Sequence, residues 1–134
     1  MIFPYLDIRR GGVIRTQPII PVTIHGPVGF RQFFALVDSG AEHSLFSLDL
    51  ITSLRLDTHN ANVVEIVGVG GDVSRGYLLD VRLQLQTHQW VGPAVFSDVM
   101  RIGSPMILGQ AGFFEFFSVA FKRRRWILDI RRAR

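Results

Sequence analysis

The sequence predicts an all-β fold, meaning a mainly β protein with one or two short helices, and three observations lead to this prediction. Apolar residues occur in short segments, turn-forming residues separate these segments, and no long stretch keeps a 3.6-residue apolar period. The chain has 134 residues, of which 48% are hydrophobic and 19% are charged. This size and composition predict one domain over residues 1–134 that buries its own core.

The first expected elements form a hairpin and a short helix. Residues 18–25 predict a strand, residues 26–29 a turn, and residues 30–37 the returning strand. Ser47 is expected to cap a short helix that ends near residue 54, with an acidic residue in its first turn.

The middle of the chain predicts a second hairpin with a glycine-rich tip. The two strands cover residues 63–67 and 73–85, and the tip is Gly68-Val69-Gly70-Gly71. Glycine permits backbone conformations that side chains resist, and we expect a positive φ at Gly70. A hairpin tip of this composition is expected to be mobile.

The remaining elements are short. A strand is expected over residues 90–96, an apolar triplet over 106–108 that stops at Gly109, and a short helix over 110–117. Residues 118–121 and 126–130 predict a last hairpin, whose apolar face of Trp126, Leu128 and Ile130 is expected to be exposed in a single chain. The core of the domain is therefore expected at about residues 17–130, followed by a basic tail at 131–134.

The charge of the chain is concentrated at one end. Residues 122–134 hold seven basic residues against one acidic residue, whereas residues 1–121 hold eight basic against ten acidic. A solvated hairpin turn with a charged tail explains this distribution. No nucleic-acid-binding motif accompanies it, so we do not expect nucleic acid as a partner.

Composition also excludes several classes of site. The chain has no Cys, which excludes disulfides, thiolate nucleophiles and Cys-based metal sites. His25, His59 and His88 are scattered without ligand spacing, so neither a metal nor another cofactor is expected. No apolar run approaches the roughly 18 residues of a membrane span, and the N-terminus lacks a signal-peptide core. We expect a cytoplasmic protein with no membrane partner.

Asp38 is the strongest candidate for a catalytic residue. It follows the apolar run Phe33-Phe34-Ala35-Leu36-Val37, which predicts a buried strand and therefore a rigidly held carboxylate at its end. Asp-Ser-Gly alone is a common turn sequence, so Asp38 as a plain turn residue is the competing interpretation. A Ser/His/Asp triad of Ser39, His43 and Asp38 is disfavoured, because three residues of one loop do not easily face one another.

Three motifs in order make the chain resemble the retropepsin-like aspartic proteases, which include retroviral and single-domain bacterial members. They are Phe34-Ala-Leu-Val-Asp38-Ser39-Gly40-Ala41, then Val67-Gly-Val-Gly-Gly71, then Ile107-Leu108-Gly109. The resemblance runs from about residue 17 to residue 130. It implies an acid-protease barrel with one lobe per chain.

The resemblance also implies roles for individual residues. Asp38 would be catalytic, within an active-site loop that continues through Ser39, Gly40 and Ala41. The residues implied to bind an extended peptide substrate are Glu42, the flap residues Gly68, Val69, Gly70 and Gly71, and Ile107. One departure from the family pattern is Gln110. Retroviral members usually have an Arg at this position, which pairs with an acidic residue near the catalytic Asp. The residue that would pair with Glu42 in this chain is therefore not identified.

Peptide hydrolysis in this class uses two facing carboxyl groups that share a proton, one activating a water and the other polarising the carbonyl. The chain has no second Asp-Ser/Thr-Gly, since Asp57-Thr58-His59 lacks the glycine. The expected protein is therefore a C2 homodimeric aspartic endopeptidase with Asp38 from each chain. An inactive peptide-binding module on the same fold is the first alternative, and a domain tethered to nucleic acid by its basic end is the second.

Overall fold

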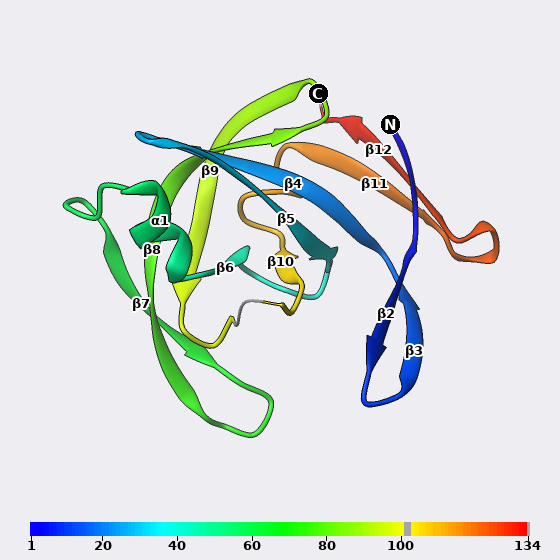
Figure 1. The fold of residues 1–134 in the computed structure, drawn as a ribbon, viewed down its shortest axis with the longest axis horizontal. Helices are drawn as coiled ribbons and strands as arrows, with labels where there is room; N and C mark the ends of the chain where they lie inside the picture. Colours follow the sequence, from blue (N-terminus) through cyan, green and yellow to red (C-terminus); the bar gives the residue numbers. More distant parts are fainter. Residues whose placement is uncertain (101–102, 134) are drawn as a thin grey trace.

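The structure is a computed structural model that describes residues 1–100 and 103–133 (Figure 1). The elements in chain order are β1 (Ile2–Pro4), β2 (Leu6–Arg10), β3 (Val13–Gln17), β4 (Ile19–Gly26), β5 (Gly29–Val37), β6 (Leu45–Ser47), α1 (Asp49–Leu54), β7 (Asn62–Val67), β8 (Val73–Leu85), β9 (His88–Ser97), β10 (Met106–Leu108), β11 (Phe117–Lys122), the 3₁₀ turn η1 (Arg123–Arg125) and β12 (Ile127–Arg132).

Six strands close into a barrel. They pair in the order β4-β5-β10-β6-β9-β8, and an additional pairing of β8 with β4 completes the ring. Strand β7 extends the sheet beyond β8, and the β7–β8 hairpin projects from the barrel (Figure 1). Most pairs are antiparallel, but β10 lies parallel to β5 and β6 lies parallel to β9. This mainly β architecture confirms the predicted fold class.

Strand β5 shows why its apolar run is continuous. Phe33, Ala35 and Val37 are buried, whereas Phe34 on the other face is 54% exposed and Leu36 is half-buried. Successive side chains of a strand point to opposite faces, so one face of β5 packs into the barrel and the other borders a more open surface. The second face is the one that also carries residue 38.

The expected short helix over residues 110–117 is wrong, because this segment forms consecutive tight turns. Gly112 has a φ of +97°, in the left-handed region, and a side chain there would collide with the backbone oxygen of Pro93. Trp90 Nε1 donates a 2.8 Å hydrogen bond to the Gly112 oxygen and holds the turn against β9. Phe113 and Phe117 stack in the core at 5.1 Å, so their four-residue spacing arises from turn packing and not from a helix.

Helix α1 ends at Leu54 as expected, but its N-terminus differs from the prediction. Ser47 belongs to β6, and Leu48 occupies the capping position without a side-chain hydrogen bond. The Ser47 hydroxyl nevertheless accepts a 3.3 Å hydrogen bond from the backbone N–H of Asp49. No helix in the described part of the chain is long and apolar enough to cross a membrane.

The C-terminal hairpin corrects two further expectations. Strand β12 continues to Arg132, so Arg131 and Arg132 pair with β11 and do not belong to a free tail. Residue 134 of that expected tail lies outside the described residues. Leu128 and Ile130 are fully buried within one chain, because β1 pairs along β12 and places Phe3 opposite Leu128. The expected exposed apolar face is therefore wrong for Leu128 and Ile130, and of its three residues only Trp126 is exposed.

The basic turn of this hairpin is solvent-exposed, and its charges are partly engaged locally. The Arg123 guanidinium lies 3.5 Å from the ring centre of Trp126, which is 39% exposed and precedes the strand. Asp129 accepts a hydrogen bond from Arg131 at 3.4 Å and lies 3.7 Å from Lys122. The hydrogen bond from Arg131, followed by the nearby positive charges, lowers the pKa of Asp129.

Residues 1–17 contain structure that the sequence did not predict. Besides β1, they form the β2–β3 hairpin, a two-stranded sheet whose register runs from Leu6 opposite Gln17 to Arg10 opposite Val13. The hairpin stands beside the barrel, on the same side of the molecule as the β11–β12 arm (Figure 1).

Candidate active site

Asp38 stands directly after β5, in a loop whose backbone holds its carboxylate. Its N–H donates to the Leu108 oxygen at 3.0 Å, and its Oδ1 accepts a 2.9 Å hydrogen bond from the Gly40 N–H. Its backbone oxygen accepts from the Ala41 N–H at 3.2 Å. Asp38 is half-buried, whereas Ser39 and Gly40 are exposed. The carboxylate is thus fixed at the rim of the barrel and accessible to a ligand.

The loop after β5 is bound to the segment after β10. The parallel pairing of β5 with β10 brings both strand ends to the same edge of the barrel. There the Gln110 N–H donates to the Ala41 oxygen at 2.8 Å, and the Ala111 N–H donates to the Glu42 oxygen at 2.9 Å. These bonds make one rigid unit of two segments about 70 residues apart in the chain.

Gly109 is required by the closeness of this contact. An added Cβ would lie 2.7 Å from the Ala41 oxygen and would also collide with the His43 oxygen. Beside it, Ser44 is fully buried, and its hydroxyl accepts from the Gly109 N–H at 3.0 Å and donates to the Ala111 oxygen at 2.8 Å. Ser44 could not be recognised from the sequence, since a lone Ser after a turn carries no distinguishing pattern.

Gln110 makes a different contact from the one expected of an Arg at this position. Its side-chain amide donates a 2.7 Å hydrogen bond to the backbone oxygen of Ser39. Glu42 is exposed, and its carboxylate makes no ion pair with any residue that the structure describes. Gln110 therefore supports the loop without neutralising Glu42.

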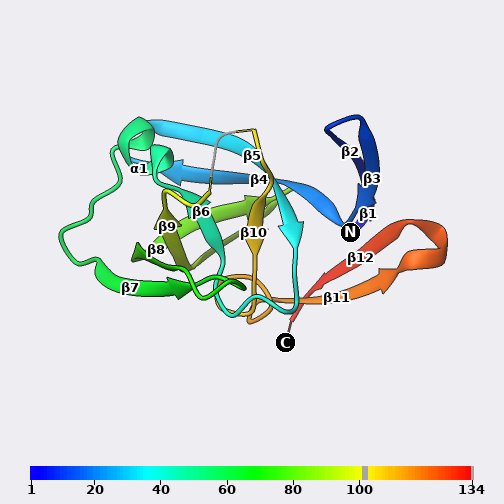
Figure 2. The ribbon, with the colours of Figure 1, turned by 90° about the horizontal axis from the view of Figure 1, so that it is seen from below.

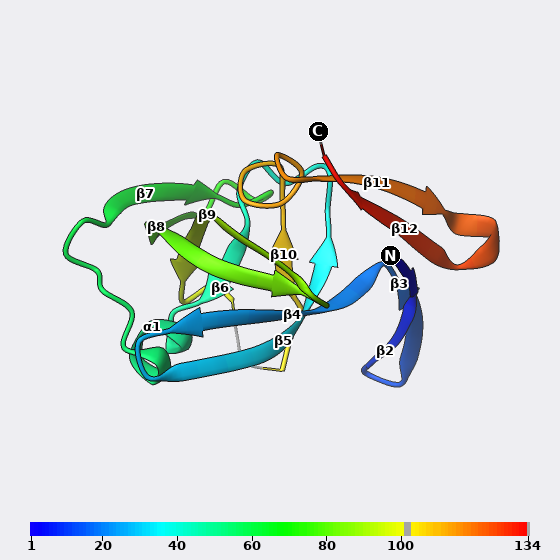
Figure 3. The same ribbon diagram turned by 90° about the horizontal axis from the view of Figure 1, so that it is seen from above.

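The glycine-rich tip lies on the same side of the molecule as the loop after β5. Both occur at the lower edge in Figure 2 and at the upper edge in Figure 3. The Gly68 N–H donates to the Asp72 oxygen at 2.8 Å, and the Gly71 N–H donates to the Gly68 oxygen at 3.0 Å. Val69 is fully solvent-exposed at the tip. The tip therefore presents an apolar side chain to solvent.

The positive φ at the tip belongs to Gly71, at +83°, and not to Gly70 as expected. We therefore expect Gly71→Val to distort the tip, because a β-branched residue resists this region. Substrate KM should rise several-fold, and the melting temperature should fall modestly, because the positive φ is strained for any L side chain although an added Cβ at Gly71 meets no atom within 4 Å. Gly29→Val is the control, as Gly29 also has a positive φ and open space but lies at the tip of the β4–β5 hairpin. Equal effects of both variants on KM would exclude a flap.

The structure brings the candidate residues together only in part. Asp38, Ser39, Gly40, Ala41 and Glu42 form one loop. Ile107 pairs with Leu36, two residues before Asp38, and is half-buried beside a cavity. The tip of residues 68–71 lies on a separate hairpin. Within the part of the chain that the structure describes, no backbone hydrogen bond joins this tip to the Asp38 loop.

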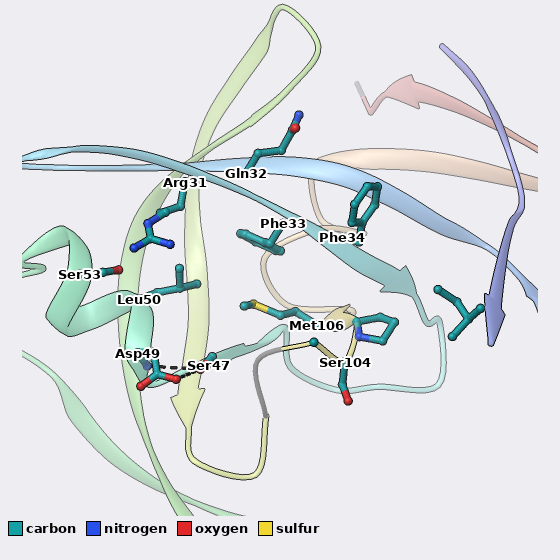
Figure 4. A pocket seen from close by; sticks show the side chains of 13 residues that line it. Arg31, Gln32, Phe33, Phe34, Ser47, Asp49, Leu50, Ser53, Ser104 and Met106 are labelled. Carbon is teal, nitrogen blue, oxygen red and sulfur yellow. Dashed lines mark hydrogen bonds between the residues drawn. The ribbon is translucent and has the colours of Figure 1, made fainter. Parts of the chain in front are cut away.

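A second cavity, of about 340 Å³, lies between β5, α1 and the residues before β10 (Figure 4). Its lining is mainly apolar, including Phe33, Leu50 and Met106, with Arg31 and Asp49 among its polar residues. Asp38 does not line it, so it is separate from the candidate active site.

Alternative chemistries gain no support from the geometry. Within residues 1–100 and 103–133, no hydrogen bond joins His43 to Ser39 or Asp38, and the His43 Nδ1 atom is buried without a partner. The same residues contain no group of three His, Asp or Glu side chains that could hold a metal ion. The carboxylate of Asp38 is therefore the group on which a proposal must rest.

The sequence model of one family, described as aspartyl protease, matches residues 20–111, which include β5, the Asp38 loop, the glycine-rich tip and β10. The chain belongs to the aspartyl protease family. The matched region of the chain contains every candidate site residue named above. No curated protein matches the chain.

Two solved structures show the same fold as this aspartyl protease family member. A retropepsin-like aspartic protease from Rickettsia conorii has a TM-score of 0.60 at 12% identity, covering 96% of this chain and 86% of that one. The EIAV protease, in complex with the inhibitor HBY-793, has a TM-score of 0.56 at 20% identity, covering 71% of this chain and 83% of that one. The fold is thus retropepsin-like.

Proposed function

We propose that the protein is a homodimeric aspartic endopeptidase that hydrolyses peptide bonds in extended polypeptide segments. The observation that carries this proposal is the placement of Asp38. Asp38 is half-buried, and the Gly40 N–H holds its carboxylate at the end of a barrel strand, in a chain of the aspartyl protease family.

One chain supplies one such carboxylate, which is why the proposal requires two chains. Asp57, in the other Asp-Thr sequence, lies between α1 and β7 and is exposed. A two-fold axis beside the Asp38 loop would bring the two Asp38 carboxyl groups face to face. Two carboxyl groups that face each other within hydrogen-bonding distance hold one proton between them, because ionising both is energetically unfavourable.

The proposed mechanism follows from that shared proton. The ionised Asp38 takes a proton from a water, and the resulting hydroxyl attacks the scissile carbonyl carbon. The protonated Asp38 of the other chain hydrogen-bonds to the carbonyl oxygen as negative charge develops on it. Collapse of the tetrahedral intermediate transfers a proton to the leaving nitrogen and breaks the C–N bond. The β7–β8 hairpin would close over the peptide and exclude bulk water.

Cleavage of a peptide library at several pH values tests the proposal. We expect kcat/KM to follow a bell on the acidic side of neutrality. Activity is lost at low pH when both carboxyl groups are protonated, and at higher pH when both are ionised. Circular dichroism at each pH verifies that the protein stays folded. A rate that keeps rising beyond about pH 9 would indicate a different nucleophile.

Binding without cleavage is the outcome that would favour a peptide-binding module instead. In that case peptides bind, no product forms at any pH, and a pepstatin-type inhibitor competes with peptide for the same site. Inhibition of turnover by the same compound supports the endopeptidase.

A further inference from the structure

A cavity of about 360 Å³ lies beside the strand that carries Asp38, and part of its wall comes from outside the matched family region. Leu36 and Ile107, paired across β5 and β10, line it. Arg10 and Gln17 of the β2–β3 hairpin also line it, and the other lining residues are Val99, Met100, Ser104 and Pro105. Residues 6–17 precede the matched region, so this wall lies outside the part of the chain that the family model covers.

The cavity adjoins the candidate catalytic residue by strand geometry. Leu36 and Asp38 are two residues apart at the end of β5, so their side chains project from the same face about 7 Å apart. Consecutive residues of an extended peptide are spaced by about 3.3 Å. If a bound peptide runs from Asp38 toward Leu36, a side chain within about two residues of the scissile bond enters this cavity.

Arg10 gives the cavity its charge. Among the described residues that line it, Arg10 alone is charged, and it makes no ion pair within the part of the chain that the structure describes. The same face of β2 presents Ile8, which lines the neighbouring cavity of Figure 4. Arg9 lies on the opposite face of the strand, since side chains alternate. The β2–β3 hairpin thus turns Arg10 toward the cavity and Arg9 away from it. Arg15, opposite Ile8 on β3, shares the face of Arg10 but does not line this cavity.

We infer that Arg10 makes this cavity a specificity pocket for an acidic substrate side chain, with glutamate as the best fit. The inference rests on the proposed endopeptidase function and assigns one of its subsites. The apolar side chains of Leu36 and Ile107 contact the methylene groups of the glutamate. The Arg10 guanidinium pairs with its carboxylate, and the Gln17 amide offers a further N–H donor.

The test compares peptide pairs that differ only in Glu against Gln, scanned over the two residues on each side of the cleaved bond. The pairs are assayed on the full chain at about pH 6, where a glutamate side chain is ionised. At one position we expect the Glu peptide to be favoured about fivefold in kcat/KM, as for a solvent-accessible charge pair of about 1 kcal/mol. Added salt should reduce this preference.

Arg10→Glu should abolish the preference for the Glu peptide over the Gln peptide. With a Lys peptide of the same sequence added to the panel, the variant should favour the Lys peptide. Arg9→Glu is the matched control, because it makes the same charge change on the adjacent residue but on the opposite face. It should leave the Glu preference in place. Equal effects of the two variants, or no Glu preference in the parent protein that cleaves other peptides, would overturn the inference and leave the endopeptidase proposal standing.

Two further outcomes separate the remaining explanations. If Arg10→Glu weakens self-association in sedimentation without altering the Glu preference, Arg10 is a contact between chains and the pocket assignment is wrong. If the parent protein cleaves no peptide at all, the proposed function fails, and fluorescence anisotropy with the same peptide pairs decides the pocket. Tighter binding of the Glu peptide that Arg10→Glu removes and Arg9→Glu retains would then support the acidic subsite alone.

Discussion

Asp38→Asn is expected to lower kcat/KM by about a thousandfold or more, because it removes the ionisable group that general acid–base catalysis requires. Asn retains a side-chain oxygen that can accept the Gly40 N–H bond now made by Asp38 Oδ1. The melting temperature should therefore stay close to that of the parent chain. Hydrolysis of the best library peptide, with active-site concentration determined by inhibitor titration, measures the effect.

Asp57→Asn is the matched control for this variant. Asp57 Oδ1 accepts a 2.9 Å hydrogen bond from the His59 N–H, the same residue spacing and length as the bond from Gly40 to Asp38. It should retain full activity. Near-parental turnover by Asp38→Asn would contradict an aspartic protease mechanism.

Mixing the inactive and parent chains tests whether the site is shared between two chains. With about nine Asp38→Asn chains per parent chain and free subunit exchange, only about one parent chain in ten pairs with another parent chain. Activity per parent chain should fall accordingly. Unchanged activity per parent chain, with exchange verified by sedimentation of labelled protein, would show that one chain suffices.

Gly109→Ala is expected to destabilise the fold by about 3 kcal/mol or more, through overpacking against backbone atoms that cannot move independently. The added Cβ would lie 2.7 Å from the Ala41 oxygen and would also meet the His43 oxygen. The melting temperature should fall by roughly 10 °C, and activity should be lost because the Asp38 loop is displaced. Differential scanning calorimetry and the peptide assay measure the two effects.

Gly70→Ala controls for the loss of glycine itself. The nearest atom to a Cβ at Gly70 is Asp72 Oδ2 at 4.0 Å, and Gly70 lacks a positive φ. Its melting temperature should therefore match that of the parent chain. A Gly109→Ala variant as stable as Gly70→Ala would mean that the Asp38 loop and the segment after β10 are not packed as tightly as described.

The sequence alone located the β4–β5 and β7–β8 hairpins and the candidate catalytic residue, since these depend on local patterns. A continuous apolar run before Asp38, turn residues at 26–29 and a glycine tip at 68–71 each act over a few residues, and β4, β5, β7 and β8 appear where these patterns place them. The resemblance to retropepsin-like proteases rests on the same local motifs.

Tertiary structure decided the segments whose conformation depends on distant partners. Residues 110–117 have helical aromatic spacing, yet the Gly112 turn packs against Pro93 and Trp90 and excludes a helix. Likewise, the apolar alternation of β12 predicts a buried face but not which chain buries it, and β1 of the same chain covers Leu128. The alternation of apolar residues shows that one face of a strand is apolar, whereas only the path of the chain determines which element covers that face.

The candidate site divides in the same way. Asp38 could be predicted because its neighbours in sequence are also its support, through β5 and the Gly40 N–H. Ser44 could not be predicted, because its role depends on Gly109, 65 residues further along the chain. Arg10 could not be predicted either, because Leu36 and Ile107 approach it only after the N-terminal hairpin folds beside the barrel. A polar side chain in a loop carries no sequence pattern of its own, so its function appears only when non-local contacts bring its partners within hydrogen-bonding or charge-pairing distance.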